Sequence, residues 1–172
     1  LQLPLFFFHK PLKGKNIAII THAGGPAVML TDALSAGGMN IPKIKGPHRD
    51  MLLSMMNPGA SADNPVDLIA TATNDQLDKV IEYVDKPLPS IDGMSVIFGD
   101  NGLNDMSEIY DLLHTKIRDC IKPLYPILPS ITSSSKLLEN VLSKGHINFP
   151  DEVVLGKALS KISNTPSPAE EK

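Results

Sequence analysis

Hydrophobic residues alternate along this chain between short continuous runs and longer stretches with helical spacing. The first run, residues 16–21, has the length and β-branched character of a buried strand. A glycine-rich turn interrupts it, and the apolar positions that follow share one helical face: Ala27, Leu30, Thr31 and Leu34. Pro26 suits the first turn of this helix, and Gly37-Gly38 ends it. The pattern predicts a strand, a glycine turn and a helix in succession.

The same alternation continues through the rest of the chain. Further strands are predicted at 94–98, 124–128 and 147–149, although Pro126 weakens the second of them. Helical spacing predicts helices at 77–84, 106–121, 137–142 and 155–162. Asp151 is suited to cap the last helix, whereas residues 45–63 are less regular.

Short apolar strands that alternate with amphipathic helices imply an α/β fold with a mostly parallel sheet and helices on both faces. About five strands of this kind favour a flavodoxin-like, doubly wound domain. A length of 172 residues fits one such domain. We assign it to residues 13–163, preceded by a linker or helix end from another domain at 1–12. The polar, proline-containing segment 164–172 is expected to be a disordered tail.

Composition narrows the function classes. The net charge is -3 and Lys and Arg are not clustered, which argues against a nucleic-acid partner. The single cysteine, Cys120, excludes an internal disulfide and fits a reducing, cytoplasmic compartment. We interpret it as a small buried apolar residue rather than a nucleophile. The apolar start of the chain is too short to span a membrane, so no membrane association is expected.

The segment from His22 to Ala27 is the main candidate binding site. In a doubly wound fold, the loop after a strand points into the ligand crevice. Glycines allow close approach to an anion, and the helix that follows offers unpaired N–H groups. We therefore assign phosphate binding to six residues: His22, Ala23, Gly24, Gly25, Pro26 and Ala27. The pattern matches neither the P-loop nor the dinucleotide fingerprint, so an ordinary tight turn remains the alternative.

Two other clusters are candidates for supporting this loop. Asn64-Pro65 starts a turn, and Asp67 is placed either to orient a neighbouring loop or to cap the helix after it. Asp100 and Asn101 follow the strand that ends at Phe98, at the same edge of the sheet, although loop solubility explains them equally well. No histidine has the spacing of a metal site, and no nucleophile motif occurs. We assign no catalytic residue and no metal ligand in this chain.

Residues 15–32, with the string Ile-Ile-Thr-His-Ala-Gly-Gly-Pro and Asp32, resemble the opening of a known domain. It is the ligase-CoA domain of ADP-forming acetyl-CoA synthetases, in the succinyl-CoA synthetase superfamily. The Asn-Pro-Val-Asp-Leu string at 64–68 resembles a second hallmark of that domain. Lys122-Pro123, Lys144-Gly145 and the helix after residues 150–152 are similar to its final third. The resemblance covers about residues 5–162.

The resemblance implies a reversible reaction in which acyl-CoA, ADP and phosphate become the free acid, CoA and ATP. A histidine on another domain would carry the phosphoryl group, and the helix from Gly24 would face it. The complete enzyme would use CoA, ADP or ATP, phosphate and Mg²⁺. Its other parts would be CoA-binding and phosphohistidine domains of the same chain and an ATP-grasp domain or subunit, in a hetero- or homo-oligomer. This domain alone would bind no cofactor and be inactive.

The chain also departs from the family pattern. His22 stands where the family usually has asparagine, so it either donates a hydrogen bond to phosphate or simply tolerates the turn. Residues 145–148 differ from the usual Gly-Ile-Pro. A non-catalytic sensor or scaffold module of a regulatory protein, such as a fused protein acetyltransferase, is the alternative function. A flavin-binding domain ranks last, because the chain has no Trp and only three Tyr.

Overall fold

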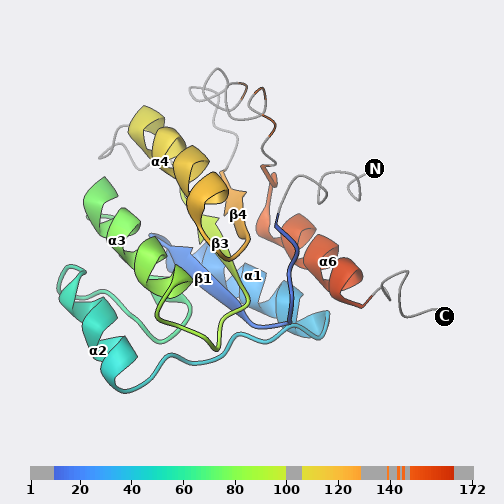
Figure 1. The fold of residues 1–172 in the computed structure, drawn as a ribbon, viewed down its shortest axis with the longest axis horizontal. Coiled ribbons are helices and arrows are strands. Elements are labelled where there is room, and N and C mark those ends of the chain that lie inside the picture. The colour runs from blue at the N-terminus through green and yellow to red at the C-terminus, as the bar shows by residue number, and fades with distance from the viewer. Residues whose placement is uncertain are drawn as a thin grey trace.

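The computed structural model is a three-layer α/β/α domain (Figure 1). It describes residues 10–99, 106–128, 139, 143, 145 and 148–164. One central sheet separates two helical layers: α2, α3 and α4 cover one face, and α1 and α6 cover the other. The predicted boundaries near residues 12 and 164 stay predictions, since the segments beyond them lie largely outside the described residues.

The sheet contains four parallel strands in the order β2-β1-β3-β4. They are β1 (Ile17–Thr21), β2 (Val66–Asp67), β3 (Gly93–Ile97) and β4 (Leu124–Ile127). Phe149 adds a parallel bridge to Ile127 and so marks a fifth position beside β4. This order, 2-1-3-4-5, is that of the flavodoxin-like fold, and the predicted fold class is confirmed.

Strand β4 shows how a proline fits inside this sheet. The carbonyl of Pro126 accepts from the N–H of Phe149, so the backbone groups of Pro126 point away from β3. The N–H and C=O of one residue point to the same side of a strand, so the missing N–H of Pro126 would also face Phe149. The hydrogen bonds between β4 and β3 therefore lose no donor. The predicted strand forms in the buried sheet despite its proline.

Local sequence signals explain most helix boundaries. The described helices are α1 (Gly24–Ala36), α2 (Pro47–Ser54), α3 (Asn74–Asp85), α4 (Met106–Asp119) and α6 (Glu152–Ser163). Asp151 caps α6 as predicted, because its side chain accepts from the N–H of Val154 at 2.7 Å. Gly38, with φ of 79°, reverses the chain after α1. Helix α2 was not predicted, and the helix predicted at 137–142 lies outside the described residues except for Glu139.

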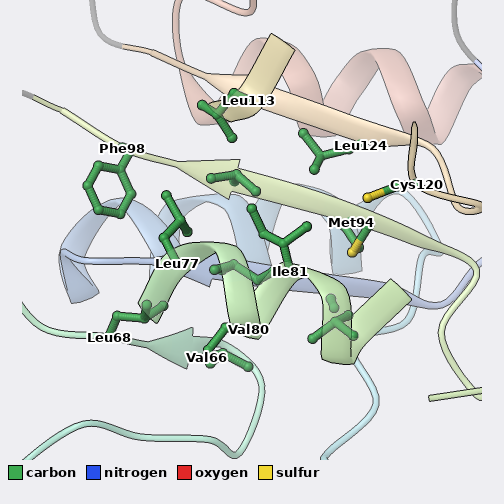
Figure 2. Close-up of a cluster of buried hydrophobic side chains, with 14 of the residues drawn as sticks. Val66, Leu68, Leu77, Val80, Ile81, Met94, Phe98, Leu113, Cys120 and Leu124 are labelled. Atoms are coloured by element: carbon green, nitrogen blue, oxygen red, sulfur yellow. The ribbon is translucent and has the colours of Figure 1, made fainter. Parts of the chain in front are cut away.

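The larger of two cores lies between the sheet and helices α3 and α4 (Figure 2). Leu77 and Ile81 of α3 contact this core together with Met94 of β3 and Leu124 of β4. Cys120 belongs to the same cluster, and burial raises the pKa of its thiol to about 11. The thiol is therefore protonated at neutral pH, as expected of a packing residue rather than a nucleophile.

On the opposite face, small residues allow α1 and α6 to pack closely. A Cβ atom on Gly156 would lie 2.5 Å from the Cβ of Ala33, so α6 has no room for a larger residue there. Leu30 and Leu34 of α1 are buried against the sheet in the same cluster as Leu155. These contacts fix the direction of α1 and place its first turn at the carboxyl end of β1. Within the described part of the chain, no helix is long and apolar enough to cross a membrane.

Candidate functional site

The candidate site lies at the carboxyl end of β1, where the strands that follow in the chain, β2 and β3, lie on opposite sides of β1. From β1 the chain passes to β2 on one side, and it then returns to β3 on the other. Thr21, the last residue of β1, pairs with Asp67 of β2 and Ile97 of β3. Ligands of open α/β sheets bind outside the carboxyl ends of the strands at such a switch point. The loop that begins at His22 therefore occupies the position that this fold uses for ligands.

The first turn of α1 leaves two backbone donors free. A helix start has four N–H groups without a helical partner, here those of Ala23, Gly24, Gly25 and Pro26. Thr21 Oγ1 accepts from the N–H of Ala23 at 3.0 Å, and proline has no N–H. No side chain caps the helix, and Gly24 and Gly25 are exposed. The donors available to a ligand are therefore the N–H groups of Gly24 and Gly25, fewer than the six-residue segment suggested.

The conformations of Gly24 and Gly25 bear on the tight-turn alternative. Neither has a positive φ, so the backbone does not require glycine at either position. A Cβ on Gly25 would meet no atom within 4 Å, and one on Gly24 would reach only Asp67 Oδ2, at 3.4 Å. Neither packing nor the turn therefore explains the two glycines. The absence of side chains does leave both N–H groups open to close approach.

His22 lies between this helix start and the end of β3. Its ring contacts that of Phe98, with centroids 4.2 Å apart, and its Nδ1 is buried without a hydrogen-bond partner. Burial lowers the pKa of His22, while the backbone of Ile97 and the carboxylate of Asp67 oppose this effect less strongly. The imidazole is therefore expected to be neutral at neutral pH and to add no positive charge to the site.

This pKa shift predicts a pH-dependent stability. The unfolded chain binds a proton on His22 at about pH 6.5, whereas the folded chain binds it only at lower pH. The free energy of unfolding should thus be greatest above pH about 6.5 and fall as the pH drops through the folded-state pKa. His22→Asn should remove this contribution to the pH dependence of the free energy of unfolding while leaving the fold intact. Urea unfolding at several pH values and NMR titration of the ring check this; a ring that titrates above its ordinary pKa contradicts it.

The structure brings Asp67 to the same site. Its Oδ1 accepts from the N–H of Ile69 at 2.9 Å, and its Oδ2 faces Gly24. Helix α3 is instead capped by Thr73, so the proposed capping of the following helix by Asp67 is wrong. Asp67 fixes the turn after β2 and places a carboxylate beside the free donors, where it disfavours a highly charged free anion.

Asn64, by contrast, lies beneath the site and not at its mouth. It is buried, and its Oδ1 accepts from the N–H of Ile19 at 2.9 Å. Its Nδ2 donates to the carbonyls of Ile17 and Pro42, both at 3.0 Å. The side chain therefore pairs with the edge of β1 that the two-residue strand β2 leaves uncovered. Asp100 and Asn101 lie outside the described residues, so their assignment stays a prediction.

Sequence reasoning missed the part played by Thr21. Its hydroxyl accepts from the N–H of Ala23 and donates to the carbonyl of the same residue, at 3.0 and 2.9 Å. A threonine two residues before the N-cap of a helix is a recognisable signal for such a turn. Among the described residues, no group of three or more His, Cys, Asp or Glu side chains is placed to hold a metal ion.

Comparison with known proteins gives an independent view of the chain. No protein-family model matches it. It is 39% identical over 66 residues to the alpha subunit of ADP-forming acetate–CoA ligase II from Pyrococcus furiosus. Over this segment the chain is similar to a subunit of an ADP-forming acetate–CoA ligase. The resemblance read from its glycine loop and Asn-Pro-Val-Asp string is thereby confirmed.

Solved structures of similar fold cover most of the chain. The dinucleotide-forming acetyl-coenzyme A synthetase 1 of Ca. Korarchaeum cryptofilum, in complex with phosphate and ADP, matches 91% of the chain with a TM-score of 0.76 and 17% identity. PH0766 from Pyrococcus horikoshii OT3 matches 92% with a TM-score of 0.81 and 22% identity. The chain spans 34% and 37% of these proteins, and its aligned segment spans 14% of the curated subunit.

Proposed function

We propose that this chain is a domain of an ADP-forming acyl-CoA synthetase, in which acyl-CoA, ADP and phosphate become the acid, CoA and ATP. Its contribution is the start of α1, which receives a phosphohistidine presented by another domain. The pair of free N–H groups at Gly24 and Gly25 is the observation on which this proposal rests. The relationship to the acetate–CoA ligase alpha subunit supports the reaction class.

Phosphoryl transfer depends mainly on positioning and on electrostatic stabilisation of the transferred group. The two N–H groups donate to phosphoryl oxygens, and the positive end of the α1 dipole lowers the energy of their negative charge. Each such interaction contributes about 0.3–1 kcal/mol when exposed and up to about 2 kcal/mol when partly buried. Docking of the carrier domain excludes water from the two N–H groups. Their interaction with the phosphoryl oxygens then approaches the energy of a partly buried contact.

The remaining chemistry belongs to other parts of the proposed enzyme. A CoA-binding domain, a phosphohistidine domain of the same chain and an ATP-grasp domain or subunit would bind and use CoA, ADP or ATP, and Mg²⁺. Under this proposal the purified 172-residue chain shows no acyl-CoA-dependent formation of ATP. A coupled luciferase assay checks this, with an intact synthetase as the positive control. Turnover by the isolated chain above a protein-free blank would contradict its assignment as one domain of the catalyst.

Free phosphate or sulfate should bind weakly at the start of α1. The site offers two exposed donors, and the nearby Asp67 carboxylate repels an anion. We therefore expect a dissociation constant in the millimolar range; a value of 1 mM corresponds to a binding free energy of about −4 kcal/mol. In an NMR titration with inorganic phosphate, the amide signals of Gly24 and Gly25 should shift together and saturate. Chloride at the same ionic strength is the control. Equal shifts with chloride, or shifts spread over the surface, would show that the helix start is no specific anion site.

A further inference from the structure

We infer that Asp67 makes the start of α1 selective for a protonated phosphate group over a fully ionised anion such as sulfate. The N–H groups of Gly24 and Gly25 donate to phosphate oxygens, and the Asp67 carboxylate accepts a hydrogen bond from a P–OH group of the same ligand. The inference rests on the proposed function and specifies the chemical form of phosphate that its site accepts.

The carboxylate of Asp67 is held in one position beside the helix start. The backbone of Asp67 exchanges hydrogen bonds of 2.8 and 2.9 Å with Ser61 and pairs with Thr21 of β1. Its Oδ1 accepts from the N–H of Ile69 at 2.9 Å, and Ile69 has a φ of 60°, which a β-branched residue rarely adopts. Such a conformation persists where the surrounding contacts impose it, so the direction of the carboxylate is fixed together with the turn.

The turn after β2 does not account for the negative charge of Asp67. An asparagine in its place would present the same Oδ1 to the N–H of Ile69 and would have nearly the same shape. The second oxygen, Oδ2, accepts no hydrogen bond from any described residue, although it is the atom that faces Gly24. The feature that distinguishes aspartate here is therefore a free, charged acceptor beside the two donors.

Asp67 Oδ2 is close enough to the donors for one ligand to contact both. It lies 3.4 Å from the position that a Cβ atom of Gly24 would take. A Cβ atom is about 2.5 Å from the nitrogen of its own residue, so Oδ2 lies within about 6 Å of the Gly24 nitrogen. Hydrogen bonds of about 2.6–3.0 Å on either side of a tetrahedral phosphate span this separation. A single phosphate can therefore accept from the helix start with one oxygen and donate to Asp67 with another.

Charge determines which anion suits this arrangement. Burial lowers the pKa of His22, and residues 24–31 contain no charged side chain, so the helix start brings no side-chain cation to the donors. A sulfate ion has only acceptor oxygens, and one of them would face the Asp67 carboxylate, where like charges repel. A protonated phosphate turns a P–OH group toward that carboxylate and forms a charge-assisted hydrogen bond instead. Two donors and one charged acceptor thus match a phosphate that keeps a proton.

The unmodified chain tests this selectivity directly. Inorganic phosphate and sulfate are each titrated into it at equal ionic strength, at a pH where inorganic phosphate is largely the monoanion. The amide signals of Gly24 and Gly25 are followed by NMR, and EDTA in the buffer removes any metal ion that could bridge the carboxylate and an anion. We expect the dissociation constant for phosphate to be at least about fivefold lower than that for sulfate.

Asp67→Asn removes the charge and keeps the acceptor for the N–H of Ile69. In this variant the dissociation constant for sulfate should fall at least about threefold, until it is no higher than that for phosphate. Hydrogen exchange at the Ile69 amide checks that the turn is kept. Asp32→Asn is the matched control, because Asp32 is exposed farther along the same helix and loses the same charge. The preference for phosphate should be unchanged in this control.

Equal dissociation constants for phosphate and sulfate in the unmodified chain overturn the inference while the anion site stands. A preference for phosphate that survives in Asp67→Asn also overturns it, because another group would then select the ligand. An equal loss of preference in Asp32→Asn does the same, since net charge alone would explain the effect. The proposed function fails in a different way: neither anion then produces a saturating shift at Gly24 and Gly25.

Discussion

Under the proposed function, Gly24→Val in the complete synthetase should slow phosphoryl transfer about a hundredfold, which is the usual cost of losing one preorganised donor at a developing negative charge. The valine side chain would stand beside the N–H groups of Gly24 and Gly25 and prevent a phosphoryl group from reaching hydrogen-bonding distance. The transfer rate is measured by rapid-quench phosphorylation from radiolabelled ATP. CoA binding should be unaffected, because the substitution lies at the start of α1 alone.

The structure indicates that this variant folds. Gly24 has no positive φ, and the nearest atom to an added Cβ is Asp67 Oδ2, at 3.4 Å, an ordinary contact distance. We expect the free energy of unfolding to change by less than about 1 kcal/mol. Ser35→Val, on the exposed side of the same helix but at its far end, is the matched control and should be silent. A normal transfer rate in a folded Gly24→Val enzyme would show that the loop is an ordinary turn.

The sequence was informative wherever a structural feature depends on neighbouring residues. The strand before His22, the helix after the glycines and the cap at Asp151 are local, and all three are present. The burial of Ala27, Leu30 and Leu34 also follows from helical spacing alone. These features need only periodicity, capping chemistry and the conformational limits of proline.

Contacts between distant segments could not be predicted in the same way. Strand β2 has two residues, too few for a hydrophobic pattern, so its segment was interpreted as a turn. The approach of Asp67 to Gly24 depends on the pairing of β2 with β1. The number of free donors depends on the Thr21 hydroxyl, which accepts from Ala23 and leaves two N–H groups where the sequence suggested more. The exposure of Val28 and Met29 depends on which side of α1 faces the sheet.

Asn64→Asp should destabilise the chain by about 3 kcal/mol, because one buried and one partly buried carbonyl lose a donor and then face a carboxylate. The asparagine Nδ2 now donates to Ile17 O and Pro42 O, while Oδ1 accepts from the N–H of Ile19. Aspartate keeps the acceptor, has nearly the same shape and also tolerates the φ of 64° at this position, so the variant isolates the loss of the donor from backbone strain.

Asn40→Asp provides the matched control, because Asn40 pairs with the start of β1 on the same edge as Asn64. Asn40 is exposed, and its Nδ2 donates only to Asn16 Oδ1, at 3.1 Å, so solvent can replace that bond. Its effect should stay within about 0.5 kcal/mol. Urea unfolding followed by circular dichroism compares the two variants with the unmodified chain. Equal stability of all three would mean that β1 does not depend on Asn64. A selective loss in Asn64→Asp would show that this side chain replaces the strand pairing that β2 is too short to give, and so holds the strand that leads into the proposed phosphate site.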